Sequence, residues 1–235
     1  MKARQQTSFL FDLDGTLVDS VYDHVLAWSE ALHEEGIEIS VWRLHRRIGM
    51  SGGLLTKALV REMGRELDEA QLLRLRELHA KHYGSRSART TALPGARELL
   101  KYLTANAIPW AIATSGRMET AAPVLEKLGV DAKQVVVITR DMVRYAKPDP
   151  DLFLAAAEKL GVAIETACVV GDSIWDMMAA RRARALGIGL LSGGYAVEEL
   201  ERSGAYRVYD DPADLSLISM RWADGGRKLF SLAAH

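Results

Sequence analysis

The chain has 235 residues, of which 49% are hydrophobic and 26% are charged. This is the composition of an ordinary globular protein of one or two domains, and it excludes a wholly disordered chain. The 30 basic residues almost balance the 31 acidic residues, and the net charge is −1. Such a balance gives no indication of a nucleic acid or an anionic membrane as a partner.

Cysteine usage and hydropathy predict a soluble protein of the cytoplasm. The single cysteine, Cys168, excludes an intrachain disulfide and a zinc site built from cysteines. It lies in an apolar run, so we expect an inert core residue. No apolar stretch reaches the roughly 18 residues that span a bilayer, and residues 1–6 do not lead into the apolar core of a signal peptide.

Short apolar runs alternate with longer amphipathic stretches along the chain. This alternation predicts an α/β fold in which parallel strands are joined by helices into a doubly wound sheet. The runs are almost unbroken, as expected of strands that are covered on both faces. The predicted strands are Ser8–Leu13, Trp110–Thr114, Val135–Thr139, Ala167–Gly171, Gly187–Leu191 and, with the weakest pattern, Tyr206–Tyr209.

The segment between the first two predicted strands has helical signals and no strand. We therefore expect an all-α domain at residues 20–89, inserted into a core formed by residues 1–19 and 90–235. The predicted helices of this insert are Val21–Glu35, Val41–Ile48, Leu54–Met63 and a fourth that starts after Asp68, which forms a capping box with Gln71.

Two further helices are predicted in the second half of the chain. In one, Asp149 is the predicted N-cap and Pro150 the first helical residue. This helix should run to Leu160 and stop at Gly161 in a left-handed conformation. The other is a final helix from about Ser216.

The first predicted strand runs directly into two acids, Asp12 and Asp14, and then into Gly15. Two carboxylates separated by one residue point to the same side while the chain stays extended. Helix capping would explain only one of them. Because ligands of open α/β sheets bind at the carboxyl ends of the strands, the pair indicates a site at that edge.

The fourth predicted strand also runs into acids, Asp172 and Asp176. If these came together with Asp12 and Asp14, the carboxylates would raise one another's pKa unless a cation intervened. Oxygen ligands at an open site suit Mg²⁺. We therefore expect a magnesium site with carboxylate ligands.

Groups that could bind an anion follow the second predicted strand and precede a later helix. Thr114, Ser115 and Gly116 offer two hydroxyls and flexible backbone N–H groups, although an ordinary N-cap is the alternative. Lys147 lies between prolines that stiffen the backbone, with a plain surface lysine as the alternative. An ammonium near the acids would offset their repulsion and bind a phosphoryl oxygen.

As a set, these motifs resemble those of the haloacid dehalogenase superfamily, in the helical-cap subgroup of β-phosphoglucomutases and phosphoglycolate phosphatases. The resemblance covers almost the whole chain and implies a Rossmann-like core with an inserted helical cap domain. The matching segments, in family order, are Asp12-Leu13-Asp14-Gly15-Thr16, Thr114, Lys147-Pro148, and Gly171-Asp172 with Asp176.

The resemblance also implies roles for these residues. Asp12 would be the nucleophile that forms an aspartyl-phosphate, and Asp14 the general acid and base. Thr114 would hold the phosphoryl group, and Lys147 would orient Asp12. The implied metal is Mg²⁺, and its implied ligands are Asp12, the backbone carbonyl of Asp14, and Asp172, with Asp176 supporting the shell.

Asp14 argues against the dehalogenase and phosphonate-hydrolysing branches, which lack this acid. The mutase branch is the alternative, because His24 follows Asp12 by twelve positions, as its cap histidine does. However, Gly52 stands where the mutase carries a phosphate-binding arginine. Arg46 and Arg47, one helical turn upstream, are candidate replacements for it.

We therefore predict a Mg²⁺-dependent phosphatase of a small phosphorylated metabolite, with a sugar phosphate first and a phosphoglycolate-like acid second. The alternatives are a sugar-phosphate mutase and a non-catalytic regulator that binds a metabolite or a partner. We expect a monomer or a weak homodimer. The predicted substrate-contacting residues are His24, Gly49, Ser51, Ser115 and Arg117.

Overall fold

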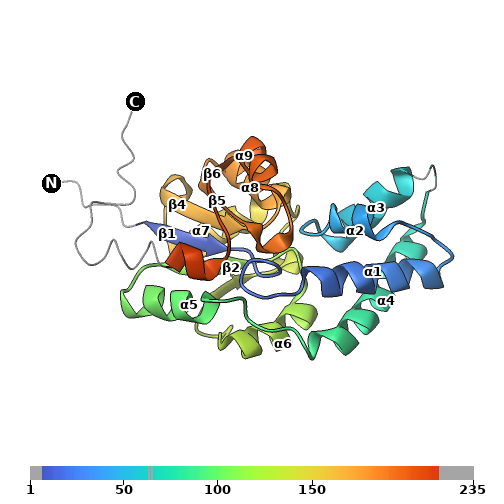
Figure 1. Cartoon of the computed structure of the whole chain (residues 1–235), viewed down its shortest axis with the longest axis horizontal. Coiled ribbons are helices and arrows are strands. Elements are labelled where there is room, and N and C mark those ends of the chain that lie inside the picture. The colour runs from blue at the N-terminus through green and yellow to red at the C-terminus, as the bar shows by residue number, and fades with distance from the viewer. Residues whose placement is uncertain (1–6, 63, 65, 217–235) are drawn as a thin grey trace.

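A six-stranded parallel sheet forms the centre of the computed structural model, which describes residues 7–62, 64 and 66–216 (Figure 1). Its strand order is β3-β2-β1-β4-β5-β6. The chain builds outward from β1 in one direction and then returns to β4 on the other side, so the sheet is doubly wound, as predicted. The strands are β1 (Ser8–Phe11), β2 (Trp110–Ala113), β3 (Val136–Ile138), β4 (Ala167–Gly171), β5 (Leu186–Leu190) and β6 (Ala205–Tyr209).

Helices cover both faces of this sheet, because successive side chains of each strand point to opposite faces. On one face Phe11 packs with Leu103 of α5 and Val124 of α6. On the other, Leu10 packs with Phe153 of α7. The helices of this part are α5 (Ala96–Ala105), α6 (Met118–Leu128), α7 (Asp151–Leu160), α8 (Ile174–Ala183) and α9 (Val197–Ser203).

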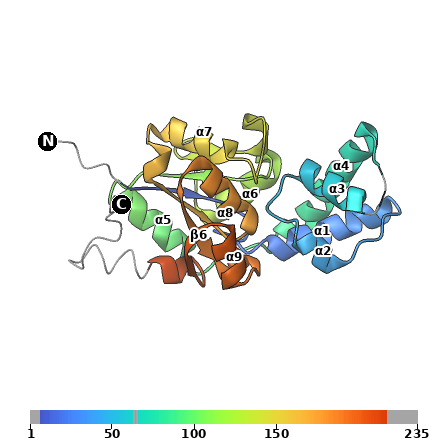
Figure 2. The ribbon, with the colours of Figure 1, turned by 90° about the horizontal axis from the view of Figure 1, so that it is seen from above.

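A second group of helices, α1–α4, lies beyond the end of the sheet (Figure 2). These helices have a hydrophobic core of their own, in which Val25, Leu44, Leu59 and Leu75 are buried. Because apolar faces of α1 and α4 meet in this core, the group does not depend on the sheet to bury them. The four helices are α1 (Val21–Glu34), α2 (Val41–His45), α3 (Gly52–Glu62) and α4 (Glu69–Ser87).

Local signals in the sequence predicted the ends of most elements well. The capping box before α4 is present: the Gln71 N–H donates to Asp68 Oδ1 at 2.7 Å, and the Asp68 N–H donates to Gln71 Oε1 at 3.1 Å. Gly161 ends α7 with φ 68°, in the predicted left-handed conformation. All six predicted strands occur, each within about two residues of its predicted ends.

Three helix predictions were wrong in detail, and a fourth cannot be compared. Helix α3 starts at Gly52, two residues earlier than predicted. Helix α7 starts one residue later than predicted, with Pro150 at the N-cap position, and Asp149 instead accepts a hydrogen bond from Arg182 at 3.1 Å. Helix α2 ends at His45, after which the chain forms hydrogen-bonded turns up to Gly49. The final helix predicted from about Ser216 lies outside the described residues. Among the described helices, none is both long and apolar enough to cross a bilayer.

Cys168 lies on β4 and only 2% of its surface is exposed. Burial raises the pKa of its thiol to about 12. We therefore expect the native protein to react with Ellman's reagent at pH 8 far more slowly than a free thiol, because the thiolate is the reactive form. The unfolded protein in guanidinium chloride should release one equivalent of the coloured product within minutes. Rapid stoichiometric reaction of the native protein would contradict a buried thiol.

Candidate active site

Three predicted site residues directly follow neighbouring strands of the sheet. Asp12 comes after β1, Thr114 after β2 and Asp172 after β4. The Asp12 N–H still donates to the carbonyl of Val170 at 2.9 Å, so the chain remains in the ladder where the side chain emerges. Because the strands are parallel, the three side chains lie at one edge, at the point where the winding of the sheet changes direction.

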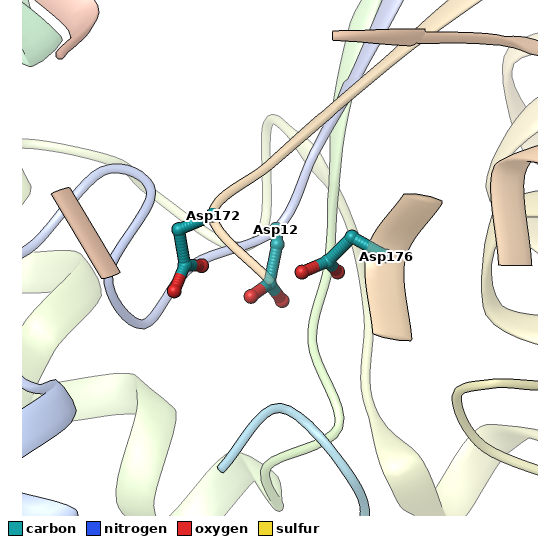
Figure 3. A group of neighbouring side chains, drawn as sticks. All are labelled: Asp12, Asp172 and Asp176. Carbon is teal, nitrogen blue, oxygen red and sulfur yellow. The ribbon is translucent and has the colours of Figure 1, made fainter. Parts of the chain in front are cut away.

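Three buried carboxylates gather at this edge (Figure 3). Asp12, Asp172 and Asp176 each offer an oxygen atom, and these atoms lie within 4.8 Å of one another. Burial, reinforced by the neighbouring carboxylates, raises the pKa of Asp172. Burial also raises the pKa of Asp12, although Lys147 opposes this effect. The cluster therefore favours the binding of protons or of a cation.

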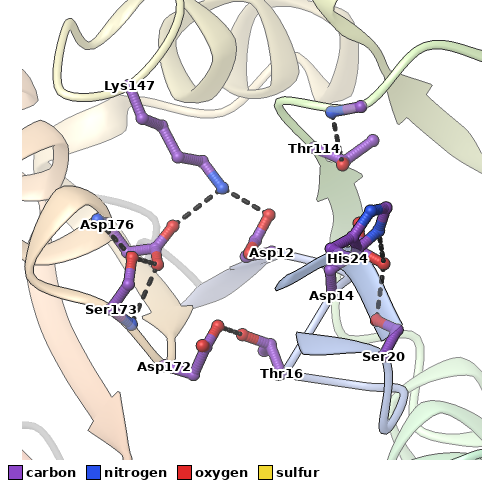
Figure 4. Close-up of polar contacts among 11 residues, drawn as sticks. Asp12, Asp14, Thr16, Ser20, His24, Thr114, Lys147, Asp172, Ser173 and Asp176 are labelled. Atoms are coloured by element: carbon purple, nitrogen blue, oxygen red, sulfur yellow. Dashed lines mark hydrogen bonds and ion pairs between the residues drawn. The ribbon is translucent and has the colours of Figure 1, made fainter. Parts of the chain in front are cut away.

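Lys147 supplies one positive charge to the cluster. Its ammonium group is fully buried, forms a short ion pair with Asp12, and lies 2.7 Å from Asp176 (Figure 4). Burial alone would lower the pKa of this ammonium, but the two carboxylates outweigh burial and raise it. Lys147 is therefore a buried counter-charge and not the surface lysine of the alternative interpretation.

The charges and ligand atoms of this cluster fit a divalent cation. Three ionised carboxylates and one ammonium leave two negative charges in a buried site. A divalent cation would neutralise them, and an all-oxygen ligand set suits a hard ion such as Mg²⁺. The chemistry of the residues is thus compatible with the predicted metal site.

The turn after β1 brings Asp172 close to the backbone. Gly15 has φ 79°, and a Cβ atom at this position would lie 2.4 Å from Asp172 Oδ2. Only glycine fits such a close approach without displacing the carboxylate. The Thr16 hydroxyl then donates to Asp172 Oδ1 at 2.9 Å. No role was predicted for Thr16, although it belongs to the first motif.

Ser173 holds Asp176 in place at the start of α8. The Ser173 N–H donates a hydrogen bond to Asp176 Oδ2 at 3.1 Å, and the Ser173 hydroxyl oxygen accepts one from the Asp176 N–H at 3.4 Å. This reciprocal pair is a capping box, so the spacing Ser-x-x-Asp was the signal that would have revealed it. Asp176 consequently turns one oxygen to its own helix and the other to Lys147.

Asp14 faces a different set of partners from Asp12. It accepts a hydrogen bond from the Ser20 hydroxyl at 2.6 Å, and its Oδ1 lies 3.1 Å from His24 Nε2. Burial alone would raise the pKa of Asp14, but His24 and Ser20 outweigh burial and lower it. The two carboxylates therefore differ in electrostatic environment: His24 and Ser20 favour the ionised form of Asp14, which must take up a proton before it can protonate a leaving group.

His24 is in turn held by helix α4. Its Nδ1 lies 3.1 Å from His79 Nε2, and its ring stacks on Tyr83 with the ring centres 3.9 Å apart. Partial burial, together with the neighbouring His24, lowers the pKa of His79. His79 had no signal in the sequence, because its position depends on how α4 packs on α1.

A cavity of about 740 Å³ lies between helices α1–α4 and this edge of the sheet. Its size is within the range of about 300–1,000 Å³ that is common for small-molecule sites. Asp12, Asp14 and Thr114 line it, whereas Lys147, Asp172 and Asp176 do not and lie beside Asp12. All five residues predicted to contact substrate line the cavity: His24, Gly49, Ser51, Ser115 and Arg117.

The segment after β2 has hydroxyls available for a ligand. Thr114 Oγ1 accepts a hydrogen bond from the Gly116 N–H at 2.9 Å, so its own hydrogen can be donated elsewhere. The Ser115 hydroxyl is buried and has no hydrogen-bond partner among the described residues. Such an orphaned group in a cavity wall suits the binding of a polar ligand atom.

The two arginines considered as replacements for the mutase arginine do not reach the cavity. Arg46 pairs with Glu199, with one nitrogen–oxygen distance of 3.2 Å, and Arg47 pairs with Glu62. Gly52 has no room for a larger side chain, because a Cβ atom there would lie 2.8 Å from the Trp28 ring. The structure therefore excludes that form of compensation.

Comparison with known proteins agrees with this geometry. The profile of the haloacid dehalogenase-like hydrolases matches residues 7–184. The chain belongs to this family. The predicted fold class, a Rossmann-like doubly wound core with an inserted helical cap, is confirmed by its solved family relatives and by the sheet described above. The prediction of an enzyme of the hydrolase class is also confirmed.

Relatives of this hydrolase include bacterial phosphatases. The chain is 36% identical over 167 residues to hexitol phosphatase A of Escherichia coli K12, covering 70% of this chain and 74% of the relative. It is 32% identical over 186 residues to a phosphoglycolate phosphatase of Agrobacterium fabrum, covering 78% and 80%. The predicted subgroup is thus confirmed.

Solved structures with the same fold cover almost the whole chain. A hydrolase from Pseudomonas syringae is 55% identical, with a TM-score of 0.90, and the match covers 92% of this chain and 99% of that one. A putative β-phosphoglucomutase from Bacteroides vulgatus has a TM-score of 0.85 over 97% and 93% of the two chains. At 20% identity, the second likeness concerns the fold alone.

Proposed function

We propose that this hydrolase is a Mg²⁺-dependent phosphatase of a small phosphorylated metabolite. The observation that carries the proposal is the pairing of Asp12 with the buried Lys147, beside a cavity that Asp14 and the free Ser115 hydroxyl also line. A carboxylate can attack phosphorus only if nearby positive charge offsets the repulsion between two anions. The relatives that are named phosphatases support the same reaction class.

In the proposed mechanism, an oxygen of Asp12 attacks phosphorus while the bond between phosphorus and the ester oxygen breaks. Asp14 gives its proton to the leaving oxygen, and the product alcohol departs. Asp14 then takes a proton from water, whose oxygen attacks the aspartyl-phosphate and displaces Asp12. Thr114 and Ser115 hold the phosphoryl oxygens, and Lys147 orients Asp12. The covalent intermediate divides the hydrolysis into two easier displacements.

Mg²⁺ is proposed to be held by Asp12, the backbone carbonyl of Asp14, and Asp172. Asp176 supports this shell through Lys147 and Ser173. When bound, the ion would stabilise the negative charge that develops on the phosphoryl oxygens.

Residues 20–89 are proposed to act as the cap domain over a core of residues 1–19 and 90–235. The separate hydrophobic core of α1–α4 supports this division, as does the position of the cavity between the two parts. A contact between His45 Nε2, at the end of α2, and the carbonyl of Gly193 at 2.8 Å links the proposed cap to the core. Closure of such a cap excludes water and selects the leaving group.

Removal of the metal tests this proposal directly. Release of p-nitrophenol from p-nitrophenyl phosphate should require millimolar Mg²⁺ and fall at least about 100-fold in EDTA, because charge stabilisation by the ion contributes several kcal/mol. Restoring excess Mg²⁺ should restore the rate. Full activity in EDTA after exhaustive dialysis would contradict the mechanism, and no activity on any phosphate ester would favour a binding protein without catalysis.

The contact between His24 and Asp14 gives a second test. His24→Ala leaves Asp14 with Ser20 as its side-chain hydrogen-bond partner, so we expect kcat for an alkyl phosphate to fall about 10-fold, the effect of losing one charged hydrogen bond. Hydrolysis of p-nitrophenyl phosphate, whose leaving group needs little protonation, should fall less. The matched control is His33→Ala, on the exposed end of α1. Equal losses for the two esters would contradict a role in proton transfer.

A sugar-phosphate mutase remains the alternative function, and the approach of His24 to Asp14 is the observation that favours it. The two functions differ in product. With β-glucose 1-phosphate and a bisphosphate activator, a phosphatase releases inorganic phosphate and a mutase forms glucose 6-phosphate. Faster formation of glucose 6-phosphate would overturn our choice. A cytoplasmic location, supported by the single buried and unpaired cysteine, and a monomer or weak homodimer are also part of the proposal.

A further inference from the structure

One cation in the wall of the cavity has no ion-pair or hydrogen-bond partner in the part of the chain that the structure describes. Arg76 lies on α4, lines the cavity, and forms no ion pair or hydrogen bond with the described residues. An unpaired guanidinium beside a ligand cavity is available to bind an anion. The other lysine and arginines of the wall are already engaged: Lys57 with Glu69 (3.7 Å), Arg117 with Asp141 (3.4 Å) and Arg140 with the carbonyl of Val143 (2.8 Å).

The start of α3 makes room for this guanidinium. A Cβ atom on Gly53 would lie 2.9 Å from an Arg76 terminal nitrogen, so Arg76 packs directly against the backbone of the first helical turn. Gly52 and Gly53 are the first two residues of α3, and their lack of side chains leaves room for Trp28 and Arg76 to approach the backbone.

Two further groups that favour an anion lie at the same place. The first N–H groups of α3 have no intrahelical acceptor and carry the positive end of the helix dipole. Ser51, directly before the helix, is only 4% exposed and lines the cavity, and its hydroxyl has no hydrogen-bond partner among the described residues. A hydroxyl, free N–H groups and a guanidinium together form the kind of donor set that binds carboxylates and phosphates.

We propose that Arg76, Ser51 and the start of α3 bind a second anionic group of the substrate, the one that is not transferred. The inference rests on the proposed phosphatase function, because it assigns the transferred phosphate to Asp12. It narrows the substrate to a phosphate monoester that carries another carboxylate or phosphate, such as a phosphorylated sugar acid. Glu77 also lines the cavity but is exposed, so water screens its charge.

Matched pairs of esters test the inference. In 6-phosphogluconate and sorbitol 6-phosphate, or 3-phosphoglycerate and glycerol 1-phosphate, a carboxylate replaces a hydroxymethyl group at the same chain length. We expect kcat/KM to be at least about 10-fold higher for the acid than for the alcohol in the better matched of these two comparisons. This factor is the effect of one hydrogen bond between charged groups. Glucose 1,6-bisphosphate and glucose 6-phosphate form the third pair. The pair with the largest ratio of kcat/KM between its two members shows whether the second anion is a carboxylate or a phosphate.

The variant Arg76→Gln should bring that ratio close to one, a loss of about 10–100-fold, while hydrolysis of the ester without a second anionic group changes less than about threefold. Arg76→Lys should give an intermediate ratio, because it keeps the charge without the bidentate geometry. The matched control is Arg74→Gln on the same helix, which removes an exposed arginine paired with Glu35 outside the cavity. Circular dichroism checks the fold of each variant.

A ratio near one for every pair in the wild type, or an unchanged ratio in Arg76→Gln, would overturn the inference and leave the phosphatase proposal intact. If the wild type hydrolyses no ester, the proposed function fails, and calorimetric binding of 6-phosphogluconate and sorbitol 6-phosphate decides the inference alone. Tighter binding of the acid that is lost in Arg76→Gln would support it, and equal binding of the two would overturn it.

Discussion

The variant Asp12→Asn is expected to lose about 10⁴-fold or more in kcat on p-nitrophenyl phosphate, the scale seen when a covalent nucleophile is removed. Asparagine keeps the volume of the side chain, but its amide cannot act as a nucleophile. Lys147 retains Asp176 as an ion-pair partner at 2.7 Å, so the fold should survive the change. Initial rates at saturating Mg²⁺ and a thermal melt measure the two effects separately.

A control and a trapping experiment make this result specific to Asp12. Asp131→Asn changes an exposed acid in the turn after α6 and should leave kcat within about twofold. Acid quenching of the wild type during turnover should leave phosphate on a peptide that contains Asp12, and the variant should carry none. More than about 1% residual activity in Asp12→Asn, or phosphate on another residue, would contradict the assignment of the nucleophile.

The edge where the site lies could be predicted because the acids and hydroxyls directly follow apolar strands. Asp12, Thr114 and Asp172 are each the first residue after a strand, and parallel pairing brings such positions to one edge whatever the loops do. The strand order was not available from the pattern, which gives only alternation. The position of Lys147 came from the family resemblance, since nothing local places an ammonium against Asp12.

The site residues that were not predicted from the sequence owe their positions to packing between helices. His79 and Arg76 lie on α4, most of whose residues are polar, so they were not distinguishable from other residues of a solvated helix. Only the contact of α4 with α1 brings His79 to His24, and only the glycine at 53 lets Arg76 reach the cavity. The N-cap of α7 was misplaced by one residue because both Asp149 and Pro150 are compatible with a helix start.

Lys147→Met should reduce both stability and activity. It leaves Asp12 and Asp176 buried without their counter-charge, and breaking a buried ion pair in this way costs about 3–5 kcal/mol. Urea unfolding at pH 8 in EDTA should show this decrease in the free energy of unfolding. In the activity assay, kcat should fall about 10³-fold. Lys133→Met, which removes an exposed lysine, is the matched control and should change stability by less than about 0.5 kcal/mol.

The stability deficit of Lys147→Met should also depend on pH, with a sign that the burial of the acids determines. Burial raises the pKa of Asp12 even with Lys147 present, and without the ammonium this carboxyl should bind a proton at still higher pH in the folded state than in the unfolded state. A raised carboxyl pKa makes the folded state bind more protons, so its stability increases as the pH falls. The deficit relative to the wild type should therefore shrink from pH 8 to pH 5.5, and Mg²⁺ should reduce it at pH 8. A deficit that is unaffected by both would mean that Lys147 stabilises the fold by packing and does not neutralise the acids.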